Sequence, residues 1–136
     1  MRAIVAVIAV PAVYVPLMLY LGTLPLPDPA ILQPPFQHIG GNAWAARPMP
    51  GTVPDDPDNP SRSELQLYEN GQSLGPRHIG HNQIAEFGHG RYSHWFRRGA
   101  SIVFSTSDNS DPNTNGRVYR AVDPNARDPY DSIRTH

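Results

Sequence analysis

A run of 24 residues without a charged side chain, from Ala3 to Leu26, constrains this chain more than any other feature. A helix needs about 20 predominantly apolar residues to cross the hydrocarbon core of a bilayer. Arg2 precedes the run, and the next basic residue is Arg47. Because basic residues favour the cytoplasmic side, we expect residues 1–26 to be a transmembrane anchor. Its residues 3–26 would contact the membrane, with the N-terminus in the cytoplasm and the rest of the chain outside it.

Two other interpretations of this run stay open. A cleaved signal peptide also begins with a basic residue and an apolar stretch, but its apolar region usually has about 7–15 residues and ends at a small-x-small cleavage site. This run is longer and has no such site at its end. The third interpretation is an apolar segment of a soluble protein. Pro11 and Pro16 remove helix hydrogen bonds, which membrane helices tolerate when neighbouring groups satisfy the backbone.

Composition excludes several function classes. The chain has no cysteine, so disulfide scaffolds, thiolate nucleophiles and cysteine-ligated metal centres are excluded. Its 11 basic residues, all arginine, and 12 acidic residues leave a formal net charge of -1. Such a balance provides no broad cationic face, and we expect no nucleic-acid partner.

Residues 27–62 predict a Pro-rich extended arm or linker. Nine prolines lie between Pro27 and Pro60, and proline-rich segments favour extended backbone over helix or sheet. Phe36, His38 and Trp44 form an apolar cluster within this polar arm, and exposed aromatic side chains usually have something that covers them. We expect these three residues to bind a partner protein. The alternative is that they dock on the chain's own small domain or on the membrane surface.

Residues 63–123 predict a small antiparallel β-domain with one short helix, so the fold class is mainly β. Alternating residues 64–68 are followed by Asn70-Gly71, the dipeptide typical of a two-residue hairpin turn. Further strands are predicted at 91–96, 100–106 and 117–122, and a short helix at 81–87 closed by Gly88. In the last strand, either Tyr119 and Ala121 or Val118 and Val122 would face the core. Residues 124–136 form a polar, extended tail.

The loop between the last two strands carries the most specific chemical pattern. Asp111, Asn113 and Asn115 match the opening of a calcium-binding loop, and with Asp108 they form a candidate calcium site. The match fails at position twelve, where Val122 replaces the bidentate glutamate. Asn, Asp and Gly also dominate tight turns for local reasons, so a purely structural turn is the alternative.

The strand at 91–96 supplies a candidate ligand surface. Arg91, Tyr92, His94 and Trp95 combine guanidinium, imidazole and aromatic groups that are able to stack on sugar rings. The alternative is a strand whose aromatic side chains pack in the core. His78 and His81 have a zinc-ligand spacing, but no third ligand completes the site and the metalloprotease motif is absent.

Several of these motifs lie close together in one stretch of the chain. Glu69-Asn70-Gly71, Leu74-Gly75-Pro76, the His78/His81 segment, Gly90 to Trp95 and Ser105 to Gly116 lie within residues 63–122. This stretch resembles a small β-rich module that recurs in bacterial proteins, often appended to glycosyl-, sulfo- or methyltransferases that act on surface polysaccharide. The resemblance implies an accessory role rather than a catalytic one.

We therefore expect a non-catalytic, single-span protein of the bacterial inner membrane. Most of its chain would be periplasmic, and it would act as an accessory or assembly subunit of a membrane protein complex through its arm and β-domain. A membrane-anchored module that binds saccharide or another envelope polymer is the alternative. A metal-dependent enzyme is a third class and would need a metal at the histidines or in the Asp/Asn loop.

Overall fold

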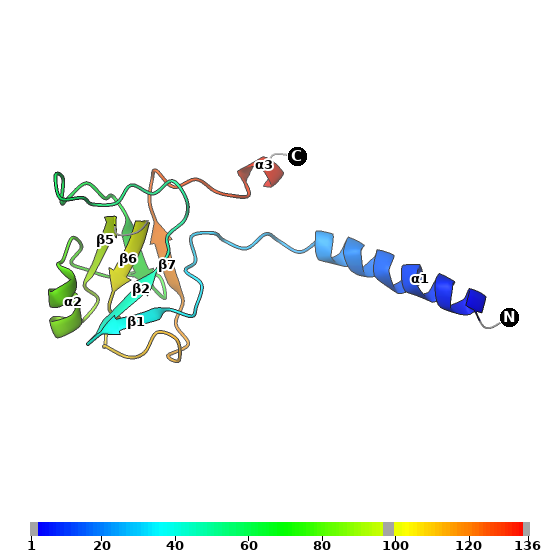
Figure 1. The fold of residues 1–136 in the computed structure, drawn as a ribbon, viewed down its shortest axis with the longest axis horizontal. Helices are drawn as coiled ribbons and strands as arrows, with labels where there is room; N and C mark the ends of the chain where they lie inside the picture. The colour runs from blue at the N-terminus through cyan, green and yellow to red at the C-terminus, as the bar shows by residue number, and fades with distance from the viewer. Residues whose placement is uncertain (1–2, 97–99, 135–136) are drawn as a thin grey trace.

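The N-terminal segment forms one helix that stands apart from the rest of the chain (Figure 1). The computed structural model describes residues 3–96 and 100–134, with side chains for 13–96 and 101–133. Helix α1 spans Ala3–Gly22. Among residues 13–96 and 101–133, whose side chains the structure describes, no helix is long and apolar enough to span a membrane. Arg2, on which the expected orientation of the anchor depends, lies outside the described residues.

Four strands form the first antiparallel sheet. They are β1 Gln37–Gly40, β2 Ala43–Ala46, β5 Tyr92–Phe96 and β6 Ala100–Phe104, in the spatial order β1-β2-β6-β5. The predicted pairing of the strands at 91–96 and 100–106 is confirmed, with Tyr92 opposite Phe104. The predicted connection, residues 97–99, lies outside the described residues.

The second sheet contains β3 Gln66–Glu69, β4 Gln72–Ser73 and β7 Tyr119–Val122, with β3 in the centre. The predicted hairpin is confirmed. Asn70 and Gly71 both have positive φ, 48° and 81°, as a type I′ turn requires. Of the two faces proposed for the last strand, Tyr119 and Ala121 are the buried one.

The core lies between the two sheets. Tyr92, Ile102 and Phe104 of the first sheet contact Leu67 and Tyr119 of the second, and all are buried. The predicted helix is confirmed as α2, His81–Phe87, which ends at Gly88 with φ +59°. Its single buried residue, Ile84, packs on Val103 and Ala43, so α2 covers the outer face of the first sheet.

The arm differs from the prediction, because much of it belongs to the domain. Residues 37–47 contain no proline, so their N–H groups can join a sheet, and they form β1 and β2. Before them, Leu32 donates its N–H to the Tyr119 carbonyl at 2.9 Å, and the Ala30 carbonyl accepts from Ala121 at 2.8 Å. The edge segment, residues 28–36, thus extends the second sheet beside β7.

The two ends of the domain leave it on one side. A short helix, α3 Asp131–Arg134, interrupts the tail that we expected to be extended. Helices α1 and α3 both lie on the side away from α2 (Figure 1). A ligand that reaches the domain beside α2 therefore approaches it from the side opposite α1.

Candidate functional site

The expected partner-binding aromatics are placed mainly inside the molecule. Phe36 was expected to contact a partner, but it is 6% exposed and packs edge-on against Phe104 and Tyr119, with ring centroids 5.4 and 5.5 Å apart. Trp44 is partly buried against the same core, and its ring lies 4.7 Å from that of the exposed His38. The Phe36 ring fills the domain's own core, which is the alternative that the sequence left open.

The four candidate ligand-binding residues do not form one surface. Tyr92 and His94 are 2% exposed and point into the core, and burial raises the pKa of the Tyr92 hydroxyl. Trp95 alternates with them in β5, and Arg91 directly precedes the strand, so both lie on the opposite side of the sheet from Tyr92 and His94. The Arg91 guanidinium lies 5.7 Å from the centre of the Phe87 ring. The structure therefore does not bring the four predicted side chains together on one face.

The Asp/Asn loop uses its side chains for internal hydrogen bonds. Asn113 accepts the Phe36 N–H at 2.7 Å and donates to the Phe36 carbonyl at 3.0 Å, so it clasps the edge segment. Asp111 accepts the Asn113 N–H at 2.8 Å, and Asn115 donates to the Tyr119 hydroxyl at 2.8 Å. These bonds provide the structural turn that the sequence left as the alternative.

Arg117 joins this loop to β3. Its guanidinium donates to Asp108 at 2.6 and 2.9 Å and lies 3.3 Å from Glu69. The hydrogen bonds from Arg117 and Ser110 hold the pKa of Asp108 well below its usual range. Burial raises the pKa of Glu69, but hydrogen bonds from Ser107, Tyr119 and Arg117 outweigh that effect and lower it.

Metal binding stays a prediction for this loop. Within residues 3–96 and 100–134, no group of three or more histidine, aspartate or glutamate side chains is placed to hold a metal ion. Asn113 and Asn115 each use both ends of the side-chain amide in hydrogen bonds within the protein.

A buried polar network centres on Asp55, a residue of the predicted Pro-rich arm. Asp55 is 0% exposed, and one carboxylate oxygen accepts the Ser63 N–H at 2.7 Å. The other lies 2.7 Å from Nδ1 of His78, which must donate because the carboxylate only accepts. Nothing in the sequence distinguishes Asp55 from its neighbours Asp56 and Asp58, which remain on the surface.

His94 continues this network inside the core. Its Nδ1 lies 2.7 Å from the Ser63 hydroxyl, and its Nε2 lies 3.3 Å from the Thr52 hydroxyl. Thr52 donates its own proton to the Met49 carbonyl, so it accepts from Nε2, and Ser63 donates to Nδ1. Burial lowers the pKa of His94 although Asp123 and Asp55 act against it, so the neutral imidazole is favoured.

A small pocket of about 180 Å³ lies over the Asp55–His78 pair, between β5 and the start of α2. Its wall includes the Trp95 side chain and Ser93, which is 3% exposed and whose hydroxyl has no hydrogen-bond partner among the described residues. The sequence singled out His78, His81 and Trp95, but it did not relate them to Asp55 or Ser93.

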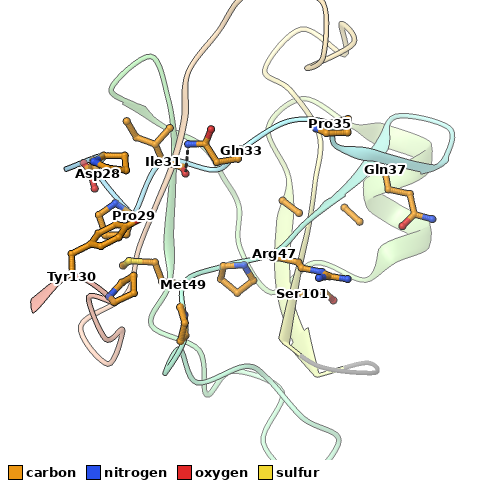
Figure 2. Close-up of a pocket in the computed structure, with 16 residues that line it drawn as sticks. Asp28, Pro29, Ile31, Gln33, Pro35, Gln37, Arg47, Met49, Ser101 and Tyr130 are labelled. Carbon is orange, nitrogen blue, oxygen red and sulfur yellow. Dashed lines mark hydrogen bonds between the residues drawn. The ribbon is translucent and has the colours of Figure 1, made fainter. Parts of the chain in front are cut away.

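A larger groove of about 1030 Å³ lies on the side from which α1 leaves. It begins at Pro27, five residues after α1 ends, and is lined by the edge segment, β1, β2 and the C-terminal segment. Figure 2 shows Asp28, Pro29 and Tyr130 at one end of this groove and Gln37, Arg47 and Ser101 at the other. We call it the anchor-side groove.

Comparisons with known proteins give no assignment: no family model, no curated protein and no solved structure matches the chain. Any functional conclusion must therefore come from the arrangement of the side chains themselves.

Proposed function

We propose that this chain is a non-catalytic, membrane-anchored accessory subunit whose β-domain contacts a partner subunit through the anchor-side groove. The single observation that carries the proposal is the exposure of apolar side chains on α1. Val13, Leu19 and Tyr20 are 69%, 69% and 63% exposed, and the domain covers none of them.

Such a helix needs an apolar environment. A helix that is apolar around its whole circumference is typical of a protein interior or a membrane. The sequence of α1 has no charged residue, and its 20 residues, at 1.5 Å each, extend for about 30 Å, close to the thickness of a bilayer core. Insertion of residues 3–26 into the bacterial inner membrane would provide this apolar environment. The position of Arg2 in the sequence, before the apolar run, favours a periplasmic domain.

The position of the groove favours a partner in the same membrane. The chain enters the edge segment within a few residues of α1, so the groove is held close to the surface that the anchor enters. Its wall includes Ile31, Met49 and several prolines, with Asp28 toward one end and Arg47 toward the other (Figure 2). A juxtamembrane segment of another subunit with apolar residues and an acidic group would match it. The resemblance to an appended bacterial module also favours an accessory role.

The test is purification of the tagged full-length protein in mild detergent, followed by size-exclusion chromatography and mass spectrometry of co-eluting proteins. We expect stoichiometric membrane-protein partners. Two glutamine substitutions make a matched pair: Gln37→Arg in the groove and Gln83→Arg on the far side, both at exposed positions. Gln37→Arg should reduce partner recovery at least tenfold, whereas Gln83→Arg should leave it unchanged. A monomer without partners, or fractionation away from the membrane, would overturn the proposal.

A further inference from the structure

The small pocket beside α2 contains an unusual buried group. The Ser93 hydroxyl is buried and makes no hydrogen bond with the described residues, although buried polar groups are nearly always paired. A serine in this state lowers stability compared with alanine. Ser105, which directly follows β6, is by contrast buried and donates to the Arg91 carbonyl at 3.2 Å. Ser93 lines the pocket, and a hydroxyl without a partner in the protein is able both to donate a hydrogen bond to a ligand and to accept one from it.

His78 supplies a second oriented group. Because its Nδ1–H donates to Asp55, the neutral ring has its acceptor at Nε2, and no described residue bonds to that atom. Asp55 is itself fixed by the Ser63 N–H, so the position of the imidazole is held by a buried carboxylate. His78 also has a φ of +59°, an uncommon conformation for a residue other than glycine. Such conformations persist where the surrounding structure holds them and are frequent at binding sites.

The charge and size of the pocket narrow the class of ligand. No arginine lines it, and its one carboxylate, Asp55, already accepts hydrogen bonds from the protein at both oxygens. The only other ionisable groups in the described lining are the imidazoles of His78 and His81, so this lining favours an uncharged polar ligand over an anion or a cation. Its volume of about 180 Å³ lies below the roughly 300–1,000 Å³ of pockets for drug-sized ligands. Trp95 adds a flat apolar wall, of the kind that packs on the C–H face of a ring.

We propose that this pocket binds a neutral, hydroxyl-bearing ring of the size of one sugar residue. Ser93 and Nε2 of His78 bind its hydroxyl groups, and the indole of Trp95 packs on its face. This site differs from the surface predicted on β5, since Tyr92 and His94 belong to the core and only Trp95 is shared. The inference goes beyond the accessory role and does not depend on it.

The test uses the full-length protein in mild detergent and saturation-transfer NMR. The probes are the methyl glycosides of glucose, galactose, mannose and N-acetylglucosamine, each at millimolar concentration, with inorganic phosphate and Zn²⁺ as competitors. We expect saturation transfer to at least one glycoside, with no competition by phosphate or Zn²⁺. Absence of transfer to all four glycosides, or displacement by phosphate or Zn²⁺, would overturn the proposal.

A matched pair of serine variants separates binding from folding. Ser93→Ala should weaken glycoside binding roughly fivefold, because one hydrogen bond to the ligand is lost. Its melting temperature should stay unchanged or rise, since the removed hydroxyl has no partner in the protein. Ser105→Ala should lower the melting temperature and leave binding unchanged. If Ser93→Ala binds as tightly as the wild type, Ser93 is not a ligand group and the proposal fails.

Discussion

His94 shows how one residue links the two halves of the interior. It lies on β5 in the first sheet, and its ring nitrogens contact Ser63, just before β3, and Thr52, in the connection after β2. Both contacts use the neutral ring in a single tautomer. Protonation would put a second proton at Nδ1, where the Ser63 hydroxyl now donates. The direction of these hydrogen bonds, as well as the desolvation of the buried ring, therefore opposes a positive charge on His94.

This predicts a pH dependence with a definite sign. Because the folded pKa of His94 lies below its ordinary value of 6.5, the unfolded chain binds the proton more readily. The contribution of the neutral His94 ring to the free energy of unfolding is fully present above about pH 6.5. It is lost as the pH falls below that value. His94→Gln should lower stability at pH 7.5 by about 1–3 kcal/mol through lost hydrogen bonds, but its stability should fall less between pH 7.5 and 5.5.

Thermal unfolding at a series of pH values, followed by near-ultraviolet circular dichroism, measures this difference. If the melting temperature changes equally with pH in His94→Gln and in the wild type, this result would contradict the assignment of a neutral, buried imidazole.

The β1–β2 hairpin is the element that joins the arm to α2. Its turn residue Gly41 has φ +52°, and a Cβ at this position would overlap the Ala85 carbonyl. That same carbonyl accepts the Asn42 N–H at 2.9 Å, so helix and turn are in direct contact. Neither backbone can move away without breaking this bond.

Gly41→Ala should therefore lower the free energy of unfolding by about 2–3 kcal/mol, because the cost of overpacking adds to the backbone cost of a positive φ. Gly71→Ala is the comparison. Gly71 also has a positive φ, +81°, but open space surrounds the added methyl group, so only the backbone cost of about 1 kcal/mol applies. Denaturant titration of both variants checks the ranking, and an equal loss in the two would show that the contact with α2 contributes nothing.

The elements that the sequence predicted correctly have strong local signals. Asn70-Gly71 specifies a hairpin turn by itself, and the β-branched and aromatic residues of β5 and β6 favour strands. β1 and β2 have weak local signals, because their eight residues include three alanines and a glycine within a proline-rich stretch. Tertiary pairing with β6 decides their structure. The Asp55–His78 contact joins residues 23 positions apart and could not be inferred from one sequence.

At the scale of the whole molecule, the domain begins near residue 28 rather than at residue 63. The fragment 27–136 keeps both sheets, Phe36 and the buried network around Asp55. The fragment 63–136 loses β1, β2, Asp55 and Thr52, which removes the carboxylate partner of His78 and leaves His94 with Ser63 alone of its two hydroxyl partners. Loss of Phe36 alone removes an aromatic core residue, a change that usually costs about 3–5 kcal/mol.

We therefore expect residues 27–136 to fold in aqueous solution with dispersed amide resonances in a ¹H–¹⁵N NMR spectrum, and residues 63–136 to give the narrow dispersion of an unfolded chain. A folded 63–136 fragment would restore the boundary that the sequence suggested. A poorly dispersed 27–136 fragment would instead make α1 necessary for folding.

The edge segment also determines how the domain would respond to mechanical force. A pull transmitted through α1 enters the domain at residues 28–32, where two backbone hydrogen bonds and the 3.2 Å contact of Asp28 with Arg120 hold the chain to β7. These bonds would carry the load before any other part of the domain does. Beyond them, the bidentate hold of Asn113 on Phe36 is the next resistance. The connection to α1 is therefore fastened in two stages, an outer one at residues 28–32 and an inner one at Phe36, so that tension applied through α1 would act on the outer stage first.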